Sequence, residues 1–336
     1  MKKDRSITIK DIAHKLDIST STVSRALRNK PDVNPETKAK VRELAEKLRY
    51  EPNSIALSLV SKRTFTIGVV VPGYHAYFYG EAISGIEELT LDHNYHIMIC
   101  NTRESYELER SIIHKLVNRR VDGIILSLSR ETKNYDHLEE LKEKNIPYVL
   151  FNRVADEIEA SKVCGDDMGG AILAVEHLLA KGYRKIAHIE GPRGLLLTEK
   201  RKEGYIHALK KANVPLDESL IVSSDFSLAS GIKCTEALMG KENKPDAIFC
   251  VCDEVAYGSI TWLKRNGFNV PTQVGVIGFT GEMFSEIIEP SLTTIQQPAY
   301  QIGMKAAELL LERINNTSLP NVAIEFKTSI IERAST

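Results

Sequence analysis

The stretch IKDIAHKLDISTSTVSRALRNKPDVNPETKAKVRELAEKLRYEPN, residues 9–53, decides the fold of the first part of this 336-residue chain. Apolar residues at helical spacing from Ile9 to Leu16 predict a short first helix. Thr8 stands at the cap position, and Asp11 follows three residues later, which is typical of a capping box.

Two further helices are predicted after a tight connection. Ser19 is the cap of a helix from Thr20 to about Arg28, and Asn34 is the cap of a third helix. Three short helices with a tight turn between the first two form a helix-turn-helix, whose second helix enters the major groove of DNA.

The second helix carries polar side chains of the types that contact base edges and phosphates. These residues are Thr20, Ser21, Thr22, Ser24, Arg25, Arg28 and Asn29.

The charge of the chain is unevenly distributed. The first 63 residues hold 15 basic and 8 acidic side chains, a net charge of +7. The remaining residues hold 29 basic and 37 acidic side chains, a net charge of −8. A basic head gains affinity for DNA by releasing its counterions. The alternative is a three-helix bundle with an ordinary polar surface.

Residues 9–53 resemble the lac/galactose repressor family of bacterial transcription regulators. The resemblance implies that a set of residues contacts double-stranded DNA, as base readers (Thr20, Ser21 and Arg25) or nearer the phosphates (Thr22, Ser24 and Asn29). We add Thr8, the helix cap, to this predicted DNA surface.

Residues 53–59 also have helical spacing, but such a segment is too short to be a stable helix alone. The resemblance implies a hinge helix that orders in the minor groove, where Ala56 and Leu59 contact DNA and Leu59 wedges between base pairs. Leu57 departs from the pattern, because many relatives have Arg or Gln there. The alternative is an apolar linker that packs on its own domain.

From Phe65 onward, short apolar β-branched runs alternate with amphipathic stretches, which predicts doubly wound parallel sheets. About 270 residues is large for one such sheet, so we expect two lobes with a ligand cleft between them. The predicted fold class is α/β: an all-α helix-turn-helix head plus a two-lobed doubly wound core, periplasmic-binding-protein-like by resemblance. The expected domains are 1–52, 53–64 (hinge) and 65–336 (effector binding and dimerisation).

Ligands in such folds lie beyond the carboxyl ends of the strands, where aromatic, polar and charged residues stand in this sequence. They suit a sugar, a sugar phosphate or a nucleobase, and a carbohydrate effector is the expected class. The predicted effector-binding residues are Tyr74, Tyr77, Phe78, Ser127, Asn152, Arg153, Arg201, Phe226, Asp253 and Thr280. Arg201 and Phe226 also match effector-contacting positions of the resembled family. Cys252 and Thr280 depart from its pattern, where Asn and Asp are common, which weakens two anchors for sugar hydroxyls.

We hypothesise a homodimer, because a palindromic operator needs two heads. The amphipathic helices after Phe78 and after Asp253 are the candidate interface. Effector binding would close or twist the lobes, change the spacing of the two hinge segments, and so favour or melt the hinge helices.

An enzyme is the first rival function, since doubly wound sheets often host catalysis. No dinucleotide-binding glycine motif follows the first strand, where residues 72–75 read PGYH, and no phosphate loop or nucleophile elbow is present. We therefore expect no catalytic residue, metal or cofactor. A pure binding protein of the periplasmic type is the second rival.

Five irregularly spaced cysteines and the absence of an export signal or membrane span predict a cytoplasmic protein with reduced thiols.

Overall fold

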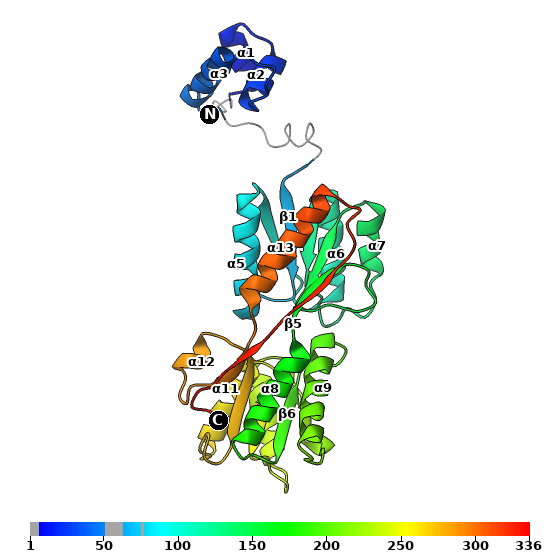
Figure 1. Cartoon of the computed structure of the whole chain (residues 1–336), viewed down its shortest axis with the longest axis vertical. Helices are drawn as coiled ribbons and strands as arrows, with labels where there is room; N and C mark the ends of the chain where they lie inside the picture. The colour runs from blue at the N-terminus through cyan, green and yellow to red at the C-terminus, as the bar shows by residue number, and fades with distance from the viewer. Residues whose placement is uncertain (1–6, 51–62, 75–76) are drawn as a thin grey trace, which may run out of the picture. The chain divides into compact units, whose positions relative to one another are not determined.

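The computed structural model describes residues 7–50, 63–74 and 77–336 (Figure 1). The chain divides into two compact units, Met1–Thr64 and Phe65–Thr336. Ala56 and Leu59 of the predicted hinge lie outside the described residues. Within the described ranges, no helix is long and apolar enough to cross a membrane.

The first unit contains the three helices that its caps predict: α1 (Ile9–Leu16), α2 (Thr20–Leu27) and α3 (Pro35–Lys47). Asp17 ends α1 in the left-handed conformation, with φ of 52°, which aspartate adopts more readily than most residues and which turns the chain toward α2. Ile12, Val23 and Val41 supply one fully buried residue from each helix. The small core leaves the polar side of α2 outside it.

The second unit has two lobes, each built on one six-stranded sheet. The sheet of lobe 1 is parallel, in the order β11-β5-β4-β3-β1-β2. Its strands are β1 (Thr66–Val71), β2 (His96–Asn101), β3 (Gly123–Leu126), β4 (Tyr148–Phe151), β5 (Ser161–Gly165) and β11 (Ala323–Phe326). The helices of this lobe are α5 (Tyr77–Asp92), α6 (Tyr106–Asn118), α7 (Asp136–Glu143) and α13 (Ala299–Asn315).

The sheet of lobe 2 has the order β12-β10-β9-β8-β6-β7, and only β12 runs antiparallel to its neighbour. Its strands are β6 (Ile186–Glu190), β7 (Ile221–Ser223), β8 (Ala247–Cys250), β9 (Gly275–Thr280), β10 (Thr293–Gln296) and β12 (Ser329–Ile331). The helices are α8 (Asp167–Ala180), α9 (Leu196–Lys211), α10 (Leu228–Met239), α11 (Asp253–Arg265) and α12 (Phe284–Ile287), with a 3₁₀ turn at Glu218–Leu220.

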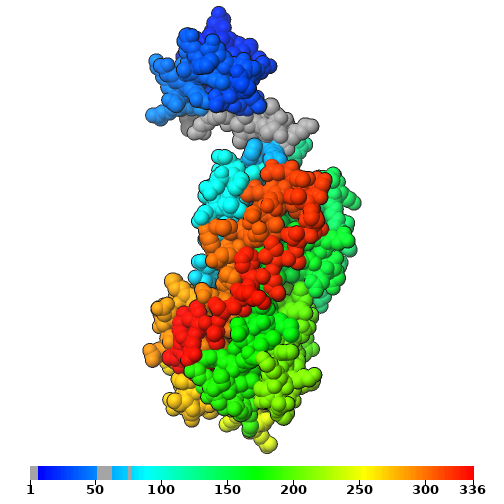
Figure 2. Space-filling view, in the orientation of Figure 1, coloured from blue at the N-terminus to red at the C-terminus, as the bar shows by residue number. Residues whose placement is uncertain are grey.

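The chain crosses between the lobes three times, after β5, after β10 and after β11. Figure 2 shows the last crossing, where the C-terminal segment runs over both lobes on one face. Because each crossing follows the carboxyl end of a strand, the carboxyl edges of the two parallel sheets lie at the boundary between the lobes. The carboxyl ends of the strands, where the sequence predicts ligand contacts, therefore face the boundary from both lobes.

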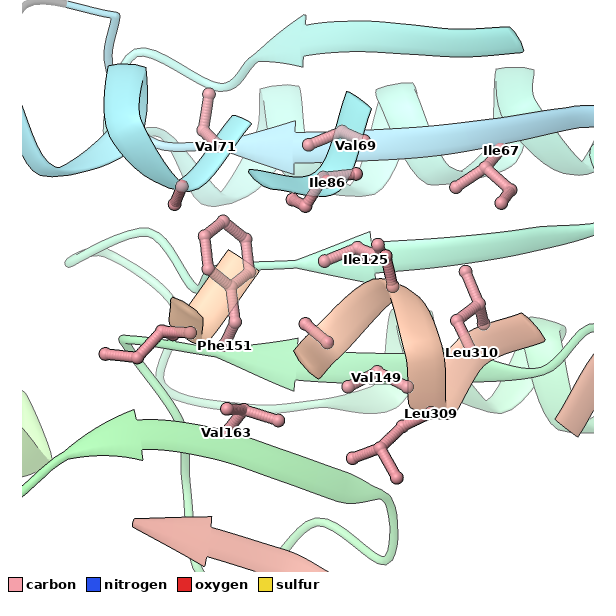
Figure 3. Close-up of a cluster of buried hydrophobic side chains, with 14 of the residues drawn as sticks. Ile67, Val69, Val71, Ile86, Ile125, Val149, Phe151, Val163, Leu309 and Leu310 are labelled. Atoms are coloured by element: carbon pink, nitrogen blue, oxygen red, sulfur yellow. The ribbon is translucent and has the colours of Figure 1, made fainter. Parts of the chain in front are cut away.

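Lobe 1 is buried on both faces of its sheet, as the unbroken apolar runs predict. Val69 of β1 belongs to the cluster under α5 and α13, whereas the next residue, Val70, packs with the helices of the other face. Figure 3 shows the first cluster, in which Phe151 and Leu310 lie among the side chains of the central strands.

Two glycines allow α5 and α13 to pack backbone against backbone. A Cβ atom at Gly303 would overlap the carbonyl oxygen of Ala82, and one at Gly85 would overlap the carbonyl oxygen of Tyr300. Neither carbonyl is the end of a flexible side chain, so the helices themselves would have to separate. This contact holds α13, which begins at the second crossing, against lobe 1.

We predict that Gly303→Ala lowers the free energy of unfolding of the second unit by about 2 kcal/mol, because it overpacks this helix contact. Gly80→Ala is the matched control on α5, since its Cβ would meet nothing within 4 Å. That change should be neutral or stabilise by about 0.5–1 kcal/mol through helix propensity. Urea denaturation of both variants measures the difference, and equal midpoints would contradict the close approach.

Candidate DNA-binding helix and ligand cleft

The start of α2 is fixed by its cap. The Ser19 hydroxyl oxygen accepts a hydrogen bond from the backbone N–H of Thr22 at 3.1 Å and lies 2.7 Å from the Ser21 hydroxyl. Thr20 and Ser21 are exposed in the first turn, and Arg25 is exposed one turn later. These three predicted base readers share the outer side of one capped helix.

Arg25 is held only weakly within the head. Its guanidinium lies 3.3 Å from the Asp32 carboxylate, and the two side chains are 58% and 54% exposed. Such exposed pairs contribute about 0–1 kcal/mol, so the guanidinium can exchange this partner for a base or a phosphate at small cost.

The other predicted DNA contacts surround this helix. Thr8 is exposed and donates from its backbone N–H and its hydroxyl to the Asp11 carboxylate, at 2.8 and 2.7 Å. Thr22 and Ser24 are half-buried, and the Ser24 hydroxyl is bonded to the guanidinium of Arg28. Asn29 is exposed and has a left-handed φ of 56° just after the helix.

The second unit has a small cavity at the boundary of its lobes, with a volume of about 80 Å³. Residues from both lobes line it: Phe78, Tyr79, Asn152, Arg153, Leu197, Arg201, Phe226, Cys252, Glu254, Thr280, Glu282 and Gln297. Six of the ten residues predicted for the effector are in this set. Ligand pockets usually measure about 300–1,000 Å³, so the cleft is nearly closed here.

Arg153 and Phe226 form a contact across the cleft. The Arg153 guanidinium donates to both oxygens of Glu104, at 2.9 and 2.7 Å, and its carbon lies 5.1 Å from the centre of the Phe226 ring. Arg153 belongs to lobe 1 and Phe226 to lobe 2. A cation over an aromatic face is attracted to it, so this pair favours the closed cleft.

Three of the lining residues have positive φ angles without being glycine: Asn152 at 58°, Phe226 at 71° and Thr280 at 140°. Asparagine adopts this region readily, whereas an aromatic or β-branched residue does so under strain. Backbone strain of this kind is concentrated at binding sites, because folding alone does not favour it. Phe226 and Thr280 therefore combine a strained backbone with a place in the lining of the cavity.

Arg201 is buried deeper, at the crossings. Its guanidinium donates to Asp167 at 2.8 and 2.7 Å and to the carbonyl oxygen of Val251 at 2.5 Å, and it lies 3.7 Å from the centre of the Phe279 ring. Burial raises the pKa of Asp167, and the Arg201 charge opposes that rise. Arg201 thus ties α8, α9 and the end of β8 together beside the cavity.

The remaining predicted residues do not line this cavity. The Ser127 hydroxyl is buried and lies 3.0 Å from the Tyr79 hydroxyl, which in turn accepts from the Asn152 amide at 3.1 Å. Ser127 therefore supports two lining residues from behind. Tyr74 is exposed in the loop after β1, and Tyr77 is half-buried at the start of α5.

Asp253 is fully buried and holds the loop after β9. Its carboxylate accepts from the backbone N–H groups of Gly281 and Glu282, at 3.1 and 2.8 Å, and from the hydroxyls of Ser285 and Thr294, at 2.9 and 2.5 Å. Burial raises the pKa of Asp253, while these donors oppose that rise. This role positions the lining residues Thr280 and Glu282.

Six lining residues were not predicted from the sequence: Tyr79, Leu197, Cys252, Glu254, Glu282 and Gln297. Gln297 directly follows β10, so the rule that selects residues after strands could have found it. Tyr79 and Leu197 lie inside helices, where their apolar spacing predicts only core packing.

We predict that Asp253→Asn lowers the free energy of unfolding by about 2–3 kcal/mol, because an amide nitrogen would face some of these four donors. Asp92→Asn, at an exposed carboxylate that ends α5, is the control and should be neutral or stabilise by about 0.3–1 kcal/mol, because it removes a negative charge from a helix C-terminus. Chemical denaturation measures both. An unchanged midpoint for Asp253→Asn would mean that the loop is held by other contacts.

Comparisons with known proteins agree with this architecture. Sequence profiles described as "Bacterial regulatory proteins, lacI family" and "Periplasmic binding proteins and sugar binding domain of LacI family" match residues 8–53 and 64–331. The match to the head excludes a pure periplasmic binding protein.

Individual relatives match along the whole chain. Catabolite control protein A of Priestia megaterium is 34% identical over 98% of this chain and 99% of its own length. The repressor CytR of Escherichia coli K12 is 32% identical, over 100% of this chain and 98% of its own. A solved complex of the transcriptional regulator CelR with cellobiose has a TM-score of 0.75 and 27% identity, covering 98% of this chain and 100% of that one.

These relatives are regulators and repressors of transcription, which removes the enzyme alternative. The helix-turn-helix head, the two-lobed core and the matches to both parts give one conclusion: the chain belongs to the lacI family of bacterial regulatory proteins and is a DNA-binding transcription regulator.

Proposed function

We propose that this protein is a cytoplasmic repressor that binds a palindromic operator as a homodimer and changes its operator affinity when a small carbohydrate binds between its lobes. The observation that carries the proposal is the exposed polar side of α2, with Thr20, Ser21 and Arg25 free of the core of the head. We assign residues 1–52 to DNA binding, 53–64 to the hinge and 65–336 to effector binding and dimerisation.

The chemistry of α2 supports base reading in the major groove. Arginine can donate two hydrogen bonds to guanine, and short hydroxyl side chains let the helix approach base edges closely. We assign base reading to Thr20, Ser21 and Arg25. Phosphate contacts, which fix the register, are assigned to Thr8, Thr22, Ser24 and Asn29. Ala56 and Leu59 are proposed minor-groove contacts on the strength of the sequence alone.

An exposed apolar surface on lobe 2 supports the dimer. Met283, Phe284 and Ile287, at and within α12, are 61%, 53% and 70% exposed. Three large apolar side chains on adjacent turns cost free energy when left in water, and such patches mark interaction surfaces. We propose that this α12 patch contributes to the interface, next to α11, whose Tyr257 hydroxyl lies 2.9 Å from that of Ser285.

The cleft supports effector binding. The CelR complex holds cellobiose in its own structure, and this chain shares that fold along 98% of its length. The cavity of about 80 Å³ is smaller than a sugar requires, so binding must displace Phe226 or separate the lobes. An effector that needs this movement favours one lobe arrangement over the other, which is the condition for control of DNA binding.

We predict that Arg25→Ala weakens operator binding by about 1–3 kcal/mol, roughly 5- to 150-fold, and lowers the ratio of operator to scrambled-DNA affinity. The operator is first selected from a randomised pool with the purified protein, and affinity is then measured by fluorescence anisotropy at several salt concentrations.

Lys40→Ala is the matched control, because it removes one positive charge from α3. It should leave the specificity ratio unchanged. If Arg25→Ala weakened both DNAs equally, Arg25 would be a phosphate contact and the assignment of α2 as the reading helix would lose its main support.

We predict that Ile287→Asp converts the dimer to a monomer, because a carboxylate would be buried in the α12 patch. Sedimentation velocity measures the mass. Leu216→Asp, at an apolar residue that is 39% exposed outside this patch, should leave the dimer intact. A wild-type protein that sediments as a monomer and still binds the full palindrome tightly would overturn the dimer proposal.

A further inference from the structure

The charges that line the cleft are unequally compensated. Its two cations, Arg153 and Arg201, are each bonded to a carboxylate that lies outside the lining, Glu104 and Asp167 respectively. The contacts are 2.7 Å in both cases. A carboxylate or phosphate ligand would therefore find no unpaired cation in the described lining of the cavity.

The two acidic residues of the lining have no such compensation. Among the described residues, no ion pair involves Glu254 or Glu282. Burial, together with the charges of Asp253 and Glu254, raises the pKa of Glu282 to about 7, while a hydrogen bond from Tyr257 opposes this rise. The half-buried Glu254 lies in the first turn of α11, whose N-terminus offsets about half a charge at most.

A third lining residue points to a ligand independently. Gln297 is 6% exposed, and among the residues that the structure describes its amide nitrogen has no hydrogen-bond partner. The amide oxygen faces Arg201, at 3.5 Å, and the nitrogen lies against Gly165 at the end of β5, so it is at the boundary between the lobes. A buried unpaired donor is costly, and an acceptor on a ligand would satisfy it.

Together these side chains indicate which chemical groups a matching ligand would carry. Glu254 and Glu282 accept hydrogen bonds and favour positive charge, Gln297 donates one to an oxygen, and Phe78 and Phe226 add apolar side chains to the lining. A sugar ring supplies the hydroxyl oxygens and an apolar face. An ammonium group supplies the charge that the two carboxylates lack.

We propose that the effector is an amino sugar, whose protonated amine lies between Glu254 and Glu282 and whose ring hydroxyl accepts from Gln297. This inference rests on the proposed function, because it assigns the ligand class of the same cleft. It also requires discrimination against sugar phosphates, since an anion placed beside two carboxylates in a buried site is repelled.

Proton coupling follows from the raised pKa of Glu282. A cation stabilises the ionised carboxylate, so binding lowers this pKa and releases a proton when the pH is below about 7. Affinity for the amine should rise as pH increases toward 7, by at most about tenfold per pH unit, and fall again at higher pH, where the amine itself loses its proton. The neutral sugar of the same ring should show a smaller rise.

The test measures binding by isothermal titration calorimetry on the full chain. The probes are the amino sugar, the neutral sugar and the sugar phosphate of glucose, galactose and mannose. On at least one ring, the amino sugar should bind about tenfold or more tightly than the neutral sugar, and the phosphate roughly 100-fold more weakly than the amine.

Glu282→Gln and Glu254→Gln should each remove most of the preference for the amine while retaining binding of the neutral sugar. Glu236→Gln, an exposed carboxylate on α10, is the matched control and should retain the preference. Thermal unfolding confirms that each variant is folded.

A neutral sugar that binds as tightly as its amino counterpart, or a phosphate that binds most tightly, would overturn the proposal. So would the failure of every probe to bind. A titration of the unliganded protein with operator DNA tests the proposed function separately. Specific DNA binding would support the repressor function even if the amino sugar proposal failed. The absence of specific DNA binding would contradict the repressor function, whatever ligand the cleft binds.

Discussion

The buried ion pair between Arg201 and Asp167 is the interaction on which the second unit depends. Asp167 begins α8 directly after the first crossing, and Arg201 also reaches toward Gln297 at the second crossing. Both charged side chains are more than nine-tenths buried. Neither could be left unpaired in that environment, because an isolated buried charge costs several kcal/mol, so the pair fixes where the two crossings meet.

The cavity takes its character from this junction. The charge of Arg201 is compensated by Asp167 at the crossings, and the charge of Arg153 is compensated by Glu104. The carboxylates are therefore the lining groups whose charge is not compensated. From the sequence alone, the same residues suit a sugar, a sugar phosphate or a nucleobase, because the sequence does not show which carboxylates pair with the two arginines. The net charge that a ligand meets in a site depends on which charged side chains form ion pairs. The pairs in this cleft join residues that are far apart in the chain.

Much of the fold could be predicted because its signals are local. Ser19 and Asn34 at the caps define α2 and α3, and the apolar runs of β1 and β4 stand at the residues where the strands occur. The cleft could be predicted only in part. The end of a strand identifies the edge at which a side chain lies, but not whether it faces the cavity. Asp253 turns inward to bind a loop, whereas Glu282, further along that loop, reaches the cavity because of the path that Asp253 imposes.

Control of the head by the cleft is limited by the stiffness of lobe 1. The chain enters this lobe at Phe65, whose backbone N–H donates to Asp122 at 3.0 Å and whose ring lies 5.4 Å from that of Tyr95. The cleft lies at the opposite end of β1, about 20 Å away at the usual rise per residue. Because Phe65 is anchored to the same sheet, it moves with lobe 1 as one body. A ligand that changes the angle between the lobes of one chain therefore alters little at Phe65 itself.

A ligand can instead alter the distance between the two Phe65 positions of a dimer. This requires that lobe 2 is held by its partner at the α12 patch while lobe 1 turns relative to lobe 2. On this argument the dimer is required for the response to ligand as well as for recognition of a palindrome.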